Sequence, residues 1–148
     1  MNIRRLLAGD AEAARRVIEE LKFTMDGVAD RSVEAGYMRS FLADDRHYLL
    51  ATYDNHEPVG YLLAYLLRRF DGRPPTMFIY EVGVAEHHRR RGIGRALVEE
   101  IKGLARADGC RNMFVLTGKG DETAMALYRA AGGTEGDADP SVSFWWKW

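Results

Sequence analysis

The sequence is poor in the features that mark several protein classes. Its 148 residues include one cysteine and four prolines. A single cysteine, Cys110, excludes an internal disulfide framework, and no Cys/His spacing is typical of a zinc site, so we expect no metal. No apolar run is long enough to cross a membrane, and no signal-peptide core follows the first residues. We therefore expect a cytoplasmic protein with no membrane partner.

An excess of charge of one sign is also missing. Lys and Arg number 21 against 22 Asp and Glu, for a net charge of -1. Without a basic field over the whole molecule, we expect no nucleic-acid partner. An RNA-binding protein that uses a local arginine cluster stays as a rival class, and steeply salt-dependent RNA binding would identify it. With 47% hydrophobic and 29% charged residues, the chain is typical of one globular domain over residues 1–148.

The hydrophobic patterns predict a mixed α/β domain with the element order β-α-α-β-β-β-α-β-α-β. Strands are expected over residues 3–7, 47–53, 59–67, 76–84, 113–116 and 142–148. Helices are expected over residues 10–22, from residue 32, over 92–108 and after residue 121. Asp10 and Asp121 are predicted as N-caps, because an aspartate side chain accepts from the free N–H groups of a first helical turn. The helix from Ser32 would turn these residues inward: Val33, Tyr37, Met38, Phe41 and Leu42.

The strand over residues 76–84 carries one acid, Glu81. Strict alternation assigns its side chains to two faces. One face would hold Phe78, Tyr80, Val82 and Val84, and the other Met77, Ile79, Glu81 and Gly83. The neighbours of Glu81 are apolar and the strand is expected to be central, so the carboxylate should face a cavity and serve as a base or as an acid that orients the acceptor. A surface acid or an arginine-paired acid is the alternative.

A basic, glycine-containing turn follows this strand and opens a helix. It reads Arg89, Arg90, Arg91, Gly92, Ile93, Gly94 and Arg95. Glycine lets the backbone approach a ligand, the N–H groups of a first helical turn attract anions, and arginines add charge-assisted hydrogen bonds. The turn therefore predicts a site for a phosphorylated cofactor. A Rossmann site is disfavoured, because position 97 is Leu where its third glycine is needed.

These residues resemble the GNAT (Gcn5-related N-acetyltransferase) superfamily. The family signature Arg/Gln-x-x-Gly-x-Gly/Ala is matched by residues 89–94. A second segment, residues 121–128 followed by Ala131 and Gly132, is similar to Asn-x-x-Ala-x-x-Leu-Tyr-x-x-x-Gly, with Asp121 where asparagine is usual. The resemblance implies a single domain with a central, mostly antiparallel sheet, a splayed parallel strand pair and about four flanking helices. It also implies acetyl-CoA as the cofactor.

Within the superfamily, three stretches resemble the aminoglycoside 3-N-acetyltransferases of the gentamicin-resistance type. They are residues 78–82, 88–93 and 120–128. That subfamily usually has aspartate where this chain has Glu81, which keeps the carboxylate and lengthens its reach. The resemblance implies a small-molecule primary amine as the acceptor, with an aminoglycoside as the leading candidate and antibiotic resistance as the consequence. A protein or amino-acid amine, or a non-catalytic CoA-binding sensor, remains an alternative.

The resemblance also suggests roles for individual residues. Val82 and Val84 would lie along the pantetheine arm. Near Gly83 the family's strand splays, so that a backbone N–H reaches the thioester oxygen; a packing gap is the alternative there. Tyr128 would donate a proton or a hydrogen bond to the leaving thiolate, and otherwise is a core tyrosine. Asp121 is placed with the cofactor-binding residues.

The C-terminal segment has no counterpart in this resemblance. Trp145, Trp146 and Trp148 alternate in the expected last strand. The sequence leaves open whether they cover the core or pack in the subunit interface of a homodimer.

Overall fold

The computed structural model describes residues 1–21, 24, 32–136 and 143–148. Within this part of the chain, five strands and four α-helices form the mixed α/β fold that the sequence predicts. The strands are β1 (Asn2–Leu6), β2 (His47–Asp54), β3 (Glu57–Leu67), β4 (Thr76–Val84) and β5 (Asn112–Val115). The α-helices are α1 (Ala11–Leu21), α2 (Ala35–Ala43), α3 (Ile93–Ala107) and α4 (Glu122–Ala130). Two short 3₁₀ turns are η1 (Ala8–Asp10) and η3 (Glu86–His88).

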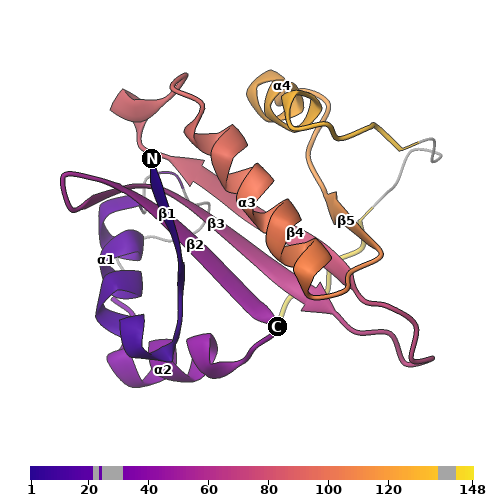
Figure 1. Ribbon diagram of the computed structural model, residues 1–148, viewed down its shortest axis with the longest axis horizontal. Helices are drawn as coiled ribbons and strands as arrows, with labels where there is room; N and C mark the ends of the chain where they lie inside the picture. The colour runs from indigo at the N-terminus through magenta and orange to yellow at the C-terminus, as the bar shows by residue number, and fades with distance from the viewer. Residues whose placement is uncertain (22–23, 25–31, 137–142) are drawn as a thin grey trace.

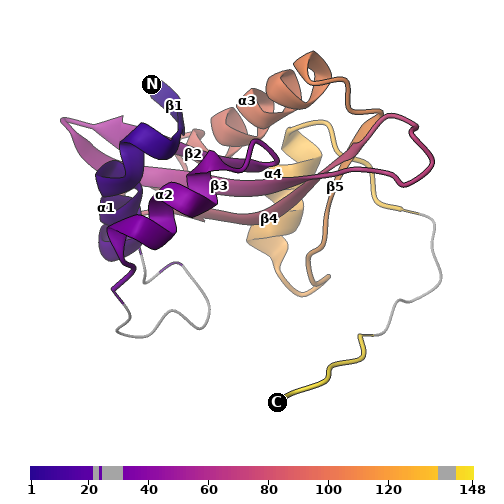
Figure 2. The same cartoon turned by 90° about the horizontal axis from the view of Figure 1, so that it is seen from below.

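The strands form one sheet in the order β1-β2-β3-β4-β5. Neighbours are antiparallel except β4 and β5, which are parallel because α3 connects them. Helix α3 covers one face of the sheet, and α1 and α2 cover the other (Figures 1 and 2). Two separate apolar clusters hold these layers on the sheet.

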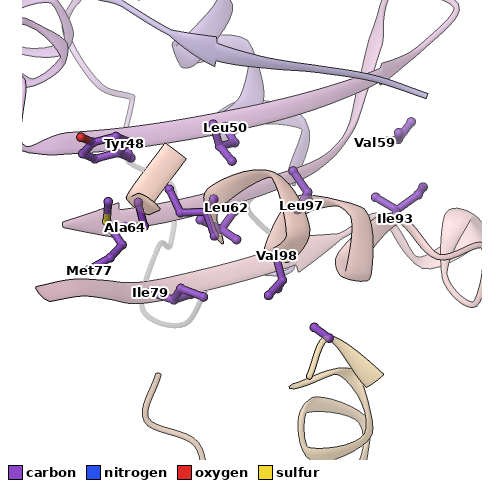
Figure 3. Packing of buried hydrophobic residues seen from close by; sticks show 13 residues of the cluster. Tyr48, Leu50, Val59, Leu62, Ala64, Met77, Ile79, Ile93, Leu97 and Val98 are labelled. Carbon is purple, nitrogen blue, oxygen red and sulfur yellow. The ribbon is translucent and has the colours of Figure 1, made fainter. Parts of the chain in front are cut away.

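The cluster under α3 is the larger one. The helix buries Leu97, Ile101 and Ala105 on one stripe, at the four-residue spacing of a helix face. These side chains belong to one cluster with Leu62 and Ile79 of the central strands, and Figure 3 shows Leu97 in this cluster. The cluster on the opposite face joins α1 and α2 to β1, β2 and β3. The strands β2 and β3 contribute buried residues to both clusters and are therefore covered on both faces, as the apolar run in β3 predicts.

Two N-terminal details differ from the sequence prediction. Asp10 does not cap α1, because the chain already turns at Ala8 and Asp10 lies inside η1. Its carboxylate instead accepts from the Leu7 N–H at 2.9 Å and pairs with Arg4 at 2.7 Å. The second helix begins at Ala35 and not at Ser32. In it Met38 and Leu42 are buried as expected, whereas Tyr37 is 64% exposed. The sequence also predicts a polar loop over residues 26–31, and these residues lie outside the described part of the chain.

The prediction of a last strand over residues 142–148 is wrong for the described part of that range. Residues 143–148 have no regular secondary structure. Trp145, Trp146 and Trp148 are 81%, 73% and 107% exposed, so they do not cover the core. Their alternative place, in a subunit interface, stays a prediction.

The alternation expected along β4 is also wrong, since a β-bulge interrupts it. Glu81 pairs with Leu63, but Ile79 pairs with the next residue, Ala64, so Tyr80 is an extra residue. Beyond the bulge the faces exchange. Val82 and Val84 pack on the cluster under α3 together with Ile79, and Glu81 lies on the opposite face.

Candidate active site

The candidate site lies where β4 separates from β5. Their pairing ends at Ile79 and Val115, so Tyr80–Val84 has no strand partner on that side within the described part of the chain. Phe78 stacks on Phe114 at 4.7 Å between ring centroids and closes the paired part of the two strands. The splayed parallel pair expected from the family resemblance is therefore present, and it begins directly before Glu81.

The open edge of β4 presents backbone donors. The Ala85 N–H donates to Val59 O of β3 at 2.9 Å. Because successive peptide groups of a strand point to opposite sides, the N–H groups of Val82 and Val84 point away from β3, and that of Gly83 points toward it. The bond from Arg89 Nε to Val84 O, at 3.3 Å, is consistent with this direction. An acyl carbonyl at this edge would find donors from Val82 and Val84.

The N-terminus of α3 follows this edge after η3. Gly92 is the N-cap and has φ 78°, and its carbonyl accepts the first intrahelical bond, from Ala96 N–H at 2.9 Å. The N–H groups of the first turn precede that bond and have no place in the helical ladder. A Cβ at Gly92 would have no atom within 4 Å. The helix end is therefore open to a ligand, and Arg89, Arg90, Arg91 and Arg95 are exposed around it.

The other signature residues have packing roles. Ile93 is 6% exposed, so only its backbone can contact a cofactor. Its side chain lies on Gly60, where an added Cβ would come within 2.8 Å of it. At Gly94 an added Cβ would lie 3.3 Å from the Leu127 side chain of α4. Gly60, which sequence reasoning missed, thus lets α3 lie close to the sheet, and Gly94 lets α4 lie close to α3.

Glu81 is half-buried on the face of the sheet that carries α1 and α2. The Tyr61 hydroxyl donates to its Oε2 at 3.3 Å. Tyr61 is 2% exposed, and its ring lies over Gly83, where a Cβ would overlap both that ring and the Thr24 hydroxyl. Gly83 therefore makes room for the side chain that holds Glu81. Sequence reasoning missed Tyr61, and the apolar run around it gives no signal of this role.

Tyr128 lies on the other side, with Val82 and Val84 against the cluster under α3. Burial, followed by the negative charge of Asp121, raises the pKa of the Tyr128 hydroxyl above its usual value. The phenol therefore stays protonated at neutral pH and can donate a hydrogen bond. Asp121 caps α4 as predicted and accepts from Ala124 N–H at 3.0 Å.

The structure thus divides the candidate residues between two faces of the sheet. Val82, Val84, Tyr128 and the N-terminus of α3 lie on the α3 side, and Glu81 lies on the α1/α2 side. The open edge of β4 connects the two. A cofactor with a phosphate group at one end and a reactive group at the other fits the first set, and a second substrate can meet Glu81 from the opposite face.

Comparisons with known proteins agree with this arrangement. The model of the acetyltransferase (GNAT) family matches residues 13–132. The chain belongs to this family and is an acyltransferase. No curated protein matches the sequence.

Three solved structures illustrate the likeness. An aminoglycoside acetyltransferase, HMB0005 from an uncultured soil metagenomic sample, is 30% identical over 97% of both chains, with a TM-score of 0.80. A second, meta-AAC0020 from an uncultured soil metagenomic sample in complex with sisomicin, is 23% identical over 99% of this chain and 95% of that one, with a TM-score of 0.85. The aminoglycoside N-acetyltransferase AAC(6')-Iy in complex with CoA is 18% identical over 99% and 98%, with a TM-score of 0.72. The last two show the fold alone.

No helix in the described part of the chain is both long enough and apolar enough to cross a membrane.

Proposed function

We propose that this protein is an acetyl-CoA-dependent N-acetyltransferase that acts on a primary amine of a small molecule. The observation that carries the proposal is the open edge of β4. It starts beside Glu81 and is followed, after η3, by the N-terminus of α3. Donors for an acyl group, donors for phosphates and a carboxylate for the amine are thereby placed along one short segment.

The residues present fit coenzyme A. The first-turn N–H groups of α3 would hold the pyrophosphate, because Gly92 has no side chain and a Cβ at its position would have no atom within 4 Å. Arg89, Arg90, Arg91 and Arg95 are exposed and would add charge-assisted bonds to phosphate oxygens. Val82 and Val84 would lie along the pantetheine arm.

The chemistry requires a neutral amine. Acetyl-CoA, when bound, supplies a thioester carbonyl that such an amine attacks. With an ordinary pKa near 10.4, only about one amine in a few thousand is neutral at pH 7, a cost of roughly 4–5 kcal/mol. Glu81 would attract the ammonium form and take its proton, directly or through water.

The remaining groups assist the transfer. The N–H groups at the open edge of β4 would stabilise negative charge on the acyl oxygen. The Tyr128 hydroxyl, kept protonated by burial, would donate a hydrogen bond to the leaving sulfur. Burial also raises the pKa of the Cys110 thiol, which argues against that residue as an activated nucleophile and supports direct transfer to the amine.

An aminoglycoside is the leading acceptor. The names of the similar solved structures support it, and one of those proteins was solved with sisomicin. The 3-amino position as the target rests on the sequence resemblance, and mass spectrometric mapping of the acetylated product tests it. Amino-acid and protein amines are the competing acceptors.

Release of the CoA thiol across a panel of amines tests the proposal. We expect turnover of acetyl-CoA with sisomicin or gentamicin above the rate without an amine. Turnover with other amines alone would support the N-acetyltransferase activity and exclude an aminoglycoside as the acceptor. If CoA binds and no amine of the panel increases thiol release, the roles of Glu81 and Tyr128 are wrong, and an acceptor outside the panel or a CoA-binding sensor is left.

Substitution Tyr61→Phe tests the support of Glu81. Loss of a hydrogen bond to a charged group should lower kcat/KM about tenfold. Tyr53→Phe is the matched control, since the buried Tyr53 hydroxyl has no hydrogen-bond partner among the described residues. An unchanged kcat/KM in Tyr61→Phe would make Tyr61 a packing residue.

A further inference from the structure

The bulge in β4 has a local effect beside the candidate base. In a regular strand, Tyr80 and Glu81 would point to opposite faces. The extra residue allows both side chains to lie on the face that carries α1 and α2. Tyr80 contacts the ring of Tyr65 on that face, and Glu81 accepts from Tyr61. An aromatic ring therefore stands next to the carboxylate.

Next to Glu81, three aromatic rings form a corner on the face that carries α1 and α2. They belong to Tyr65, Phe78 and Tyr80, and we call them the aromatic corner. The rings of Tyr65 and Tyr80 are 5.6 Å apart at 82°, and those of Phe78 and Tyr80 are 6.0 Å apart at 84°. Tyr65 and Phe78 are half-buried, whereas Tyr80 is 57% exposed. The two neighbours thus fix the exposed ring in place.

The charge distribution of this corner suits a cation. Aromatic faces carry negative potential and attract ammonium groups within about 6 Å. Glu81 adds a carboxylate close enough to influence Tyr65, whose hydroxyl has a pKa raised by burial and, to a smaller extent, by Tyr80 and Glu81. The apolar ring surface also suits the C–H face of a sugar. Exposed aromatic area beside a carboxylate is therefore complementary to an amino sugar.

We propose that the aromatic corner binds an amino-sugar ring of the acceptor, with the ring and its ammonium group against Tyr80 and the reacting amine at Glu81. This inference rests on the proposed function and gives its acceptor a binding surface. It predicts that acceptors with an ammonium group beside the reacting amine are preferred over simple monoamines. Tyr80 would act in substrate affinity and not in the transfer itself.

The test compares wild type with Tyr80→Leu, Tyr80→Phe and a control, Phe70→Leu. Phe70 lies in the β3–β4 loop and is fully exposed. Tyr80→Leu should raise the KM for sisomicin about tenfold, with kcat and the KM for acetyl-CoA nearly unchanged, because a cation–aromatic contact is lost. Tyr80→Phe keeps the ring and should resemble wild type, as should Phe70→Leu. With cyclohexylamine, which has one ammonium group, Tyr80→Leu should have little effect.

The outcomes separate this inference from the proposed function. If wild type acetylates amines but Tyr80→Leu has an unchanged KM for sisomicin, the binding role of the aromatic corner is wrong, whereas the proposed acetyltransferase activity is retained. If no amine is acetylated, the proposed function fails. Calorimetric titration with sisomicin then tests separately whether the aromatic corner binds an amino sugar. Binding that is weakened by Tyr80→Leu supports the corner; equal or absent binding overturns it.

Discussion

Glu81→Gln should lower kcat/KM by about 10²–10⁴ at pH 7, since general base catalysis typically contributes that much. The amide keeps the size of the side chain and can still accept from the Tyr61 hydroxyl, which lies 3.3 Å from the present carboxylate. It cannot take the amine proton. The Kd for CoA should stay at the wild-type value, because Glu81 lies on the face opposite α3. Steady-state kinetics with the best acceptor, together with CoA titration, measure both.

The pH dependence makes this prediction sharper. In Glu81→Gln the reactive species is the small neutral fraction of the free amine, which grows about tenfold per pH unit below its pKa. The deficit relative to wild type should therefore shrink as the pH rises from 7 to 9. Glu57→Gln, at the exposed start of β3, is the control and should keep wild-type kinetics. A deficit that is constant with pH would assign Glu81 a role other than proton removal, and no deficit would remove it from the mechanism.

Gly92→Val should weaken CoA binding roughly a hundredfold, the effect of losing one or two hydrogen bonds to charged phosphate oxygens. Gly92 has φ 78°, a conformation that costs a residue with a Cβ about 1–2 kcal/mol. An added Cβ would have no atom within 4 Å apart from its chain neighbours, so the valine side chain should project into the space where a phosphate approaches the helix end. Calorimetric titration with CoA measures the change.

The opposite end of α3 offers a matched control. Gly109 also has φ 78°, and a Cβ there also has no atom within 4 Å. Gly109→Val should therefore lower the thermal midpoint of unfolding about as much as Gly92→Val does, while its CoA affinity stays at the wild-type value. Equal losses of CoA affinity in both variants would show that general strain, and not the blocked helix end, is responsible.

The sequence predicted those parts of the fold that depend on local pattern. Helix α3 was found because its apolar residues repeat with helical spacing between two glycines, Gly92 and Gly109. The positions of the first five strands along the chain followed from apolar runs separated by turn residues. The cofactor segment was recognisable because glycines, arginines and a preceding strand occur together within a few residues.

What the sequence did not predict depends on pairing between distant segments. The bulge at Tyr80 is visible only in the register between β3 and β4. The contact of Tyr61 with Glu81 joins residues on neighbouring strands, and the role of Gly60 depends on how closely Ile93 packs on the sheet. In the C-terminal segment, the alternating pattern was correct for a strand but had no partner strand among the described residues.

The bulge also gives β4 one residue more than its pairing with β3 needs. The segment from Met77 to Val84 buries Met77 and Ile79 on the α3 side, presents Glu81 on the other, and returns Val82 and Val84 to the first. Deleting Tyr80 would make Ile79 and Glu81 neighbours, and ordinary alternation would then keep all these side chains on their present faces. Deleting a residue next to it, such as Val82, would shift the alternation and turn either the acid or the preceding apolar pair to the wrong face. Changes of length should therefore be tolerated in the β3–β4 loop, whereas within this segment only the loss of Tyr80 preserves both faces.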